Sequence, residues 1–385
     1  MSTSVLIALA ASLIATIAIH PFLVKIAHAK NIVDNPDARK LQKTPVPVLG
    51  GAAIFLGIVV GIGTSGLHAD CSSLMIILAA MIVMLYIGML DDILSLSARL
   101  RFAVEVLIVC LLIGYTGLSI NDFHGLWNIY DISKWLAFGL TVFATVGIIN
   151  SINLIDGVDG LSSGYCVMAS AVFAIYFGQT GQHDMLILAC ACVGSMIPFF
   201  FHNVFGKTSK MFIGDGGTLT MGIVLSTFVV YTLSSNPANI SPAASSFGLI
   251  PFTLAVLSIP VFDTLRVMTA RILRKTSPFN PDKTHLHHLF IEMGFSHAGA
   301  SVSIISLNAL VIAAQLLTWK LGGSIDMQLY VVVAIALLFT CGLYYGMHSL
   351  SEKNMLKRAM LKAGRLSRIE RKGIFLTLQH LVDKA

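Results

Sequence analysis

The stretch SSLMIILAAMIVMLYIGML, residues 72–90, decides the fold, because it holds no charged residue and runs directly into Asp91 and Asp92. A helix of about 20 apolar residues is long enough to cross the hydrocarbon core of a bilayer. Similar stretches recur along the 385 residues, which are 56% hydrophobic and 11% charged, whereas soluble domains carry about 25% charged residues. Backbone polar groups in lipid must be satisfied within helices, so the sequence predicts an all-α polytopic membrane protein.

Apolar length and basic residues together predict the topology. We expect about eleven transmembrane helices, at residues 4–27, 48–67, 72–90, 102–118, 135–149, 160–177, 185–204, 216–233, 247–262, 302–320 and 327–347. With this count, every Lys and Arg except Lys134 and Lys320 falls on one side. Basic residues favour the cytoplasmic side, which predicts a periplasmic N-terminus and a cytoplasmic C-terminus.

The chain is expected to divide into a transmembrane domain, residues 1–348, and a basic tail, residues 349–385. Apolar residues such as Met355, Leu356 and Leu366 alternate with basic ones in the tail. This pattern favours an amphipathic helix on anionic lipids, with a solvated tail as the alternative. No nucleic-acid-binding domain accompanies the charge, so nucleic acid is not an expected partner.

Polar clusters lie in the loops that this topology places in the cytoplasm. Asp91 and Asp92 are adjacent carboxylates that a nearby cation would make tolerable. In NSINLIDGVDG, residues 150–160, Asn or Asp recurs every third residue, which on a helical turn gives one oxygen-rich face suited to a hard cation or to sugar hydroxyls. The interleaved glycines allow tight turns or close backbone approach to a ligand.

Two later segments add further polar groups. In FIGDGGT, residues 212–218, Asp215 stands between glycines at a predicted helix start, where N–H groups favour phosphate. After the ninth predicted helix, a long basic loop contains His285, His287 and His288. A zinc site is one interpretation of these histidines, but the oxygen-rich surroundings favour phosphate or sugar binding.

Carboxylates, basic residues and histidines gathered at one membrane face indicate phosphoryl transfer to a membrane-bound acceptor. Mg²⁺ suits such a site because it needs only one or two protein carboxylates beside substrate phosphates and water. A transporter is the alternative from another class, and it predicts charged groups at mid-depth along several helices. Glu105 is the main residue of that kind.

A fifth polar cluster, DNPDARKLQKTPVPVLGG at residues 34–51, lies in the first cytoplasmic loop of this topology. The five motifs together resemble the polyprenyl-phosphate N-acetylhexosamine-1-phosphate transferases, and most of all their undecaprenyl-phosphate α-N-acetylglucosaminyl branch. The resemblance implies ten or eleven helices with a cytoplasmic active site in the bacterial inner membrane. It implies that UDP-GlcNAc and undecaprenyl phosphate give undecaprenyl-diphosphate-GlcNAc and UMP, which primes O-antigen or enterobacterial common antigen synthesis. Mg²⁺ is the implied cofactor, with Mn²⁺ as a substitute.

The resemblance also assigns residues to roles. Asp91, Asp92, Asp156 and Asp159 would be catalytic, and Asp215 and Asn153 would hold the metal. The implied substrate-binding residues are Lys43, Asn150, Asn203, Asp263, Arg266, His285, His287 and His288. A sister transferase with UDP-GalNAc, UDP-FucNAc or UDP-MurNAc-pentapeptide as donor stays open, as do a homodimer and the choice between direct attack, which we favour, and a covalent intermediate.

Overall fold

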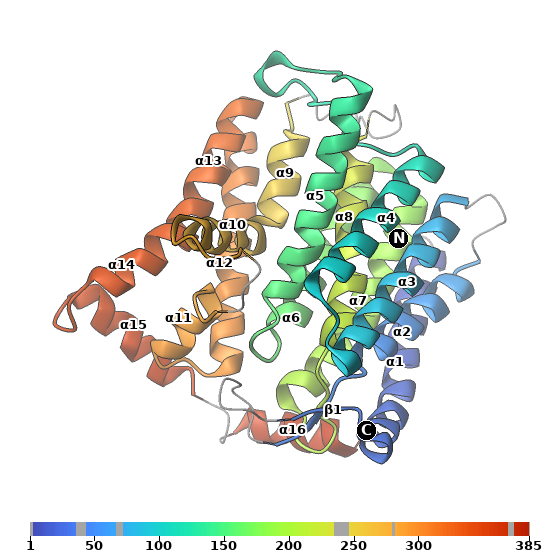
Figure 1. Ribbon diagram of the computed structural model, residues 1–385, viewed down its shortest axis with the longest axis vertical. Coiled ribbons are helices and arrows are strands. Elements are labelled where there is room, and N and C mark those ends of the chain that lie inside the picture. The colour runs from blue at the N-terminus through green and yellow to red at the C-terminus, as the bar shows by residue number, and fades with distance from the viewer. Residues whose placement is uncertain are drawn as a thin grey trace. The chain divides into compact units, whose positions relative to one another are not determined.

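The structure is a computed structural model that describes residues 3–35, 44–66, 72–234, 246–278, 282–368 and 373–384. Figure 1 labels its helices and strands. Contacts along the chain divide it into two compact units. The first unit comprises Met1–Gly117, Ser162–Phe228 and Arg371–Ala385, and the second comprises Leu118–Leu161 and Val229–Glu370.

The first unit holds α1 (Thr3–Lys30), α2 (Gly50–Thr64), α3 (Ser72–Leu94), α4 (Ala98–Thr116), α7 (His183–Phe205), α16 (Ile374–Lys384) and most of α6 (Leu161–Thr180) and α8 (Gly214–Leu233). Two short antiparallel strands, β1 (Val33–Asp34) and β2 (Val46–Pro47), also belong to it. The second unit holds α5 (Lys134–Leu154), α9 (Leu249–Val256), α10 (Ser258–Leu273), α11 (Leu286–Glu292), α12 (His297–Lys320), α13 (Ile325–Leu337), a π-helical turn (Leu338–Gly342), α14 (Leu343–Ser349) and α15 (Met355–Leu366), together with a short 3₁₀ turn (Leu126–Asn128).

Each of the eleven predicted apolar stretches contains helix, which confirms a polytopic all-α membrane protein. By length and composition, eight helices in the described ranges qualify as membrane spans, or nine if the bent pair α9 and α10 is one span. The two remaining predicted stretches correspond to α2, which is apolar but shorter, and to α4, which carries charged residues. The count of eleven spans and the orientation of the termini stay predictions.

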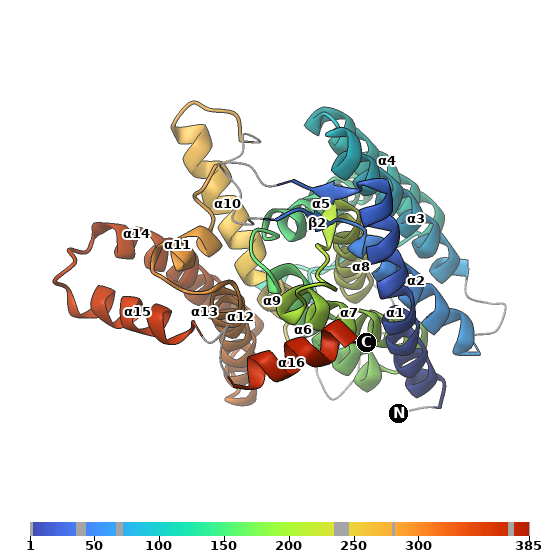
Figure 2. The same cartoon turned by 90° about the horizontal axis from the view of Figure 1, so that it is seen from below.

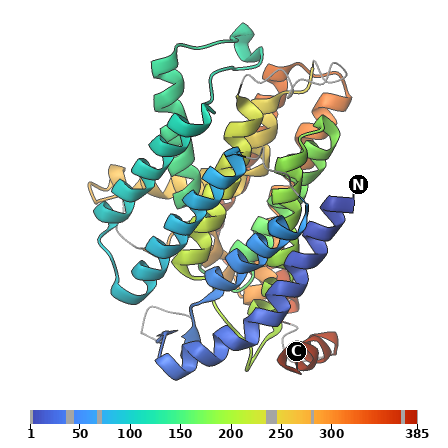
Figure 3. The same ribbon diagram turned by 90° about the vertical axis from the view of Figure 1, so that its right-hand side faces the viewer.

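Small residues allow α1, α2 and α7 to pack closely (Figure 3). A side chain added at Gly57 of α2 would overlap Thr16 of α1 and Ser195 of α7. The hydroxyls of Thr16 and Ser195 lie 2.9 Å apart, and Ser195 also donates to the carbonyl of Ile54. In lipid, no hydrophobic driving force brings helices together, so close packing and hydrogen bonds of this kind stabilise their association.

Close backbone approach at glycines also brings α3 and α2 against the start of α8. A side chain at Gly88 would overlap the backbone of Asp215 and Gly216, and one at Gly51 would overlap that of Gly217. The segment before α8 is also tied to α2, because the N–H groups of Gly50 and Gly51 donate to the carbonyls of Phe212 and Ile213. The end of α3 therefore meets the first turn of α8.

The ninth predicted helix is broken rather than straight. α9 and α10 meet at an angle of 75° around Leu257. Asn308 of α12 bonds to backbone groups freed at the break, accepting from the N–H of Ile259 and donating to the carbonyl of Val256. A bent backbone at membrane depth needs such replacement partners.

The tail forms two helices, α15 in the second unit and α16 in the first. Met355, Leu356 and Leu366 on α15 are exposed. The helical part of the prediction for this segment is confirmed, whereas its contact with anionic lipid and the boundary at residue 348 stay predictions.

Candidate active site

In the first unit, Asp91 lies in the last turns of α3 and binds two donors. One carboxylate oxygen accepts from the N–H of Leu96 at 2.7 Å, and the other accepts from Arg101 Nη1 at 2.9 Å. The guanidinium of Arg101 thus supplies part of the positive charge that was expected beside the aspartate pair.

Asp92 binds the beginning of α8. Its two oxygens accept from the N–H groups of Asp215 and Gly216, at 3.0 and 3.3 Å. A carboxylate is favoured there by unsatisfied N–H groups and the helix dipole. From the sequence, phosphate was the expected partner of these N–H groups. In the structure they hold Asp92, because Gly214, with φ of +66°, lets the chain turn directly beside that carboxylate.

Arg101 of α4 joins three carboxylates and was not among the predicted site residues. Besides Asp91, its guanidinium lies 3.7 Å from Asp215 Oδ2 and 3.6 Å from Glu105 Oε1. The side chain of Glu105 is 1% exposed, whereas that of Asp215 is 33% exposed. Arg101 therefore connects a buried acid to the accessible aspartate at the start of α8. The only sequence signal was its position shortly after the aspartate pair.

Two substrate-binding predictions fall nearby in the sequence. Asn203 is buried, and its side-chain N–H donates to the carbonyl of Met211 at 2.9 Å, which fixes the segment leading to Asp215. A contact with nucleotide stays a prediction for this residue. Lys43 lies outside the described residues.

In the second unit, the Asn- and Asp-rich segment is helical only to Leu154. Asn150 and Asn153 lie on α5, where the Asn150 side chain donates to the carbonyl of Val146. Asp156 and Asp159 lie in the turns that follow, so the four side chains do not share one face of a helical turn as the spacing predicted. Gly160, with φ of +80°, permits the tight turn that leads into α6.

This turn contacts α11 and α12. Asp159 Oδ2 lies 2.9 Å from His297 Nδ1, and the carbonyl of Asp159 accepts from Ser301 Oγ at 2.7 Å. His297 was not predicted, since a single histidine after a long loop carries no signal. The exposed Asp156 is the member of this turn most open to a ligand.

Replacing Gly157 by alanine should destabilise the chain, because the new methyl group would overlap the ring of His287. Forcing a methyl group into a packed site costs about 1–3 kcal/mol, so we expect a lower unfolding temperature in detergent. Gly147→Ala on α5 is the matched control, since nothing lies within 4 Å of its added carbon. A Gly157→Ala protein as stable as the Gly147→Ala protein would contradict the placement of His287.

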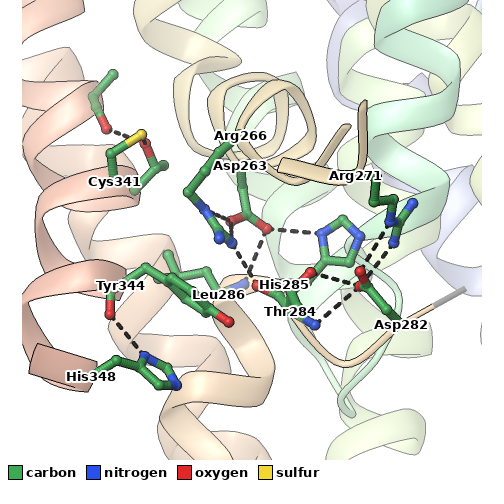
Figure 4. Close-up of polar contacts among 12 residues, drawn as sticks. Asp263, Arg266, Arg271, Asp282, Thr284, His285, Leu286, Cys341, Tyr344 and His348 are labelled. Carbon is green, nitrogen blue, oxygen red and sulfur yellow. Dashed lines mark hydrogen bonds and ion pairs between the residues drawn. The ribbon is translucent and has the colours of Figure 1, made fainter. Parts of the chain in front are cut away.

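Asp263 of α10 organises the histidine-containing loop (Figure 4). One carboxylate oxygen lies 2.6 Å from Arg266 Nη2, and the other lies 3.0 Å from His285 Nδ1 and 3.1 Å from the N–H of Leu286. Its side chain is only 3% exposed. Asp263 is thereby placed to hold Arg266, His285 and the start of α11, and direct substrate binding by it stays a prediction.

Arg266 is fixed from two further directions. Its Nη2 also donates to the carbonyl of Thr284, and its guanidinium carbon lies 3.9 Å from the centre of the Tyr344 ring (Figure 4). This cation–π contact holds the guanidinium plane against α14. A fixed guanidinium loses little entropy when it binds phosphate.

A second ion pair closes the loop between α10 and α11. Arg271 Nε and Nη2 donate to the two oxygens of Asp282 at 3.0 and 2.9 Å. Partial burial alone would raise the pKa of Asp282, but the hydrogen bonds from Arg271 and Thr284 outweigh it and hold that pKa well below its usual range. The loop is therefore closed by a charged pair throughout the neutral pH range.

Of the three predicted histidines, His285 and His287 are buried and His288 is half-buried. Burial, together with the neighbouring His288 and His285, lowers the pKa of His287 to about 3. His287 is therefore neutral in the folded chain at physiological pH, and it can offer one donor and one acceptor.

Acid should destabilise the folded chain through His287. Below its ordinary pKa of 6.5, the unfolded chain binds a proton at this position and the folded chain does not, so stability is greatest above pH 6.5 and falls toward pH 3. The free energy of unfolding should fall by about 2 kcal/mol between pH 7 and pH 5. The unfolding temperature of the His287→Gln protein should depend less on pH than that of the unchanged chain. The exposed His380 supplies the control, and equal pH slopes for the His287→Gln and His380→Gln proteins would refute the assignment.

Within the described ranges, no group of three or more His, Cys, Asp or Glu side chains is arranged to hold a metal ion. The zinc interpretation of the histidines therefore has no ligand set in that part of the chain. In the first unit, the carboxylate of Asp215 is 33% exposed, and Mg²⁺ needs only one or two protein carboxylates.

Comparison with known proteins gives the same family of transferases that the motifs resemble. Residues 74–233 match Glycosyl transferase family 4. A Bacillus subtilis (strain 168) protein named "Probable undecaprenyl-phosphate N-acetylglucosaminyl 1-phosphate transferase" is 32% identical over 330 residues, which cover 85% of this chain and 88% of the relative. The chain belongs to glycosyl transferase family 4.

Other relatives of this family 4 member carry the name "Undecaprenyl-phosphate alpha-N-acetylglucosaminyl 1-phosphate transferase". The protein from Escherichia coli (strain K12) is 29% identical over 298 residues, which cover 76% of this chain and 78% of the relative. The one from Yersinia pestis is 28% identical over 294 residues, which cover 75% and 77%. The predicted family is confirmed. The matched segment includes Asp91, Asp92 and Asp215 and ends before Asp263.

Proposed function

We propose that this family 4 chain transfers N-acetylglucosamine 1-phosphate from UDP-GlcNAc to undecaprenyl phosphate and releases UMP. The names of the relatives support the reaction class. The observation that carries the proposal is the arrangement in the first unit: Arg101 contacts both Asp91 and Asp215, and Asp92 holds the N-terminus of α8. Charges fixed in this way suit phosphoryl transfer, where catalysis is mostly positioning and electrostatic stabilisation.

The proposed chemistry is a direct displacement. An oxygen of the lipid phosphate attacks the β-phosphorus of the nucleotide sugar, the bond from that phosphorus to the bridging oxygen breaks, and UMP leaves with the electron pair. A phosphate monoester has its second pKa near 6, so most of the lipid phosphate needs no base at neutral pH. Asp91 and Asp92 would accordingly act mainly in positioning, with Asp91 orienting Arg101.

We further propose that Asp215 holds Mg²⁺, or Mn²⁺ in its place, together with phosphate oxygens of the donor. When bound, the ion would offset negative charge on the diphosphate as UMP leaves. Asp215 suits this role because its side chain is 33% exposed. The resemblance implies metal binding for Asn153 and catalytic roles for the carboxylates of Asp156 and Asp159.

The finer assignments follow from the resemblance and complete the proposal. Arg266 and the histidines His285, His287 and His288 would bind the sugar and the phosphates. The active site would face the cytoplasm in the bacterial inner membrane, with the basic α15 on anionic lipid. The product would prime O-antigen or enterobacterial common antigen synthesis.

A panel of donors tests the proposal. The purified protein in detergent is given undecaprenyl phosphate and one UDP-sugar at a time: UDP-GlcNAc, UDP-GalNAc, UDP-FucNAc or UDP-MurNAc-pentapeptide. We expect UMP release to be fastest with UDP-GlcNAc. Faster release with another donor would keep the reaction class and change the sugar, whereas no release with any donor would favour a transporter.

A further inference from the structure

The loop between α7 and α8 surrounds a carboxylate from α16. Asp383 Oδ1 accepts from three successive N–H groups, those of Lys207, Thr208 and Ser209, at 2.9, 3.0 and 3.1 Å. The hydroxyl of Ser209 is a fourth donor at 3.0 Å. Converging N–H groups of this kind form an anion-binding concavity. Here the anion is a side chain nearly 180 residues away in the sequence.

The rest of α16 supports this contact. Phe375 is buried, and its ring centre lies 4.9 Å from that of Phe205, the last residue of α7. Figure 2 shows α16 beside the end of α7. Partial burial would raise the pKa of Asp383, but the hydrogen bonds from the loop outweigh it and lower that pKa, so the carboxylate stays charged at neutral pH.

The opposite side of the loop is fixed by histidines. The carbonyl of Ser209 lies 2.8 Å from His20 Nε2, and its hydroxyl lies 3.1 Å from His202 Nδ1. The rings of His20 and His202 stack with centres 3.9 Å apart. Ser209 therefore lies between Asp383 on one side and this histidine pair on the other.

The loop leads directly into the candidate active site. The carbonyl of Met211 accepts from the buried side chain of Asn203, and the N–H of Phe212 donates to the carbonyl of Pro47. Gly214 and Asp215 follow, where the first turn of α8 meets Asp92. Ser209 therefore lies six positions before Asp215 on one connected segment.

We propose that α16 is a latch, in which Asp383 is a positioning residue that holds the α7–α8 loop and, through it, the start of α8 with Asp215. The latch acts through the four donors of the loop and touches no reacting atom. The kinetic half of this inference rests on the proposed function, and the structural half does not.

Hydrogen exchange on the purified full chain tests the structural half. In Asp383→Ala, the amides of residues 207–209 should exchange at least about tenfold faster, as expected when hydrogen bonds to a charged group are lost. Exchange in residues 211–216 should also rise. The control is His380→Ala, on the same helix and exposed. Unchanged exchange at 207–209, or a rise that does not reach 211–216, would overturn the latch.

Kinetics test the connection to catalysis. We expect Asp383→Ala to lower kcat by about tenfold with little change in KM, because misplacement lowers the rate without removing a binding group. Asp383→Glu, which keeps the acceptor charge, should recover part of the rate. Normal turnover in Asp383→Ala would overturn the positioning role. If the wild-type chain releases no UMP with any donor, the proposed function fails, and the exchange rates still decide the latch.

Discussion

Replacing Asp215 by asparagine should lower kcat by about a hundredfold to a thousandfold, the range found when one electrostatic stabiliser is removed from an active site. Asp215 stands in the first turn of α8, with its side chain 33% exposed and 3.7 Å from Arg101. Asparagine keeps the size and removes the charge. Because Asp92 accepts from backbone N–H groups here, the start of α8 should keep its structure.

The matched control for this result is Asp184→Asn. Asp184 is likewise an acid in the first turn of a long apolar helix, α7, so the change has the same chemistry at an equivalent helix position. We expect Asp184→Asn to retain normal UMP release. Similar activity in the two proteins would remove Asp215 from the active site, and a lower unfolding temperature of Asp215→Asn would indicate a structural role instead.

Replacing Arg101 by methionine should give the second large effect, a loss of activity of about a hundredfold together with lower stability. The change removes the cation shared by Asp91, Asp215 and Glu105. Removing one partner of a buried ion pair costs about 3 kcal/mol, and Glu105 is 1% exposed. Activity is measured as UMP release, and stability by thermal unfolding in detergent.

Three further variants separate the two consequences of losing Arg101. Arg99→Met, at an exposed position of the same helix, should be neutral. Arg101→Lys should recover part of the activity, since lysine keeps the charge and loses the planar fork. The double change Arg101→Met with Glu105→Gln should recover stability and stay inactive. If that double variant regained activity, Arg101 would be acting only through Glu105.

The helices were largely predictable because apolar length is a strong local signal. The stretch at residues 72–90 became α3, with its end extended to Leu94. The 75° bend between α9 and α10 was not predicted, although Pro260 has no N–H to donate to the carbonyl of Val256. The replacement hydrogen bonds come from Asn308, about 50 residues later in the sequence, and that contact carries no local signal.

The acidic members of the site were found by motif, but their contacts were not. Which residue faces Asp215 depends on how α3, α4 and α8 meet, and that depends on close packing at glycines such as Gly88. Arg101 therefore appeared in the sequence only as one basic residue among many. Asp383 carried no signal at all, since its partners are backbone N–H groups of a distant loop.

The most direct test of the central claim measures both products of one reaction. Purified protein in detergent receives UDP-GlcNAc labelled in the sugar and undecaprenyl phosphate, with Mg²⁺ or with EDTA. UMP release and the mass of the lipid product are followed together. The proposed function predicts one UMP for each undecaprenyl-diphosphate-GlcNAc formed, in Mg²⁺ and not in EDTA. UMP without a labelled lipid diphosphate, or equal product in EDTA, would contradict it.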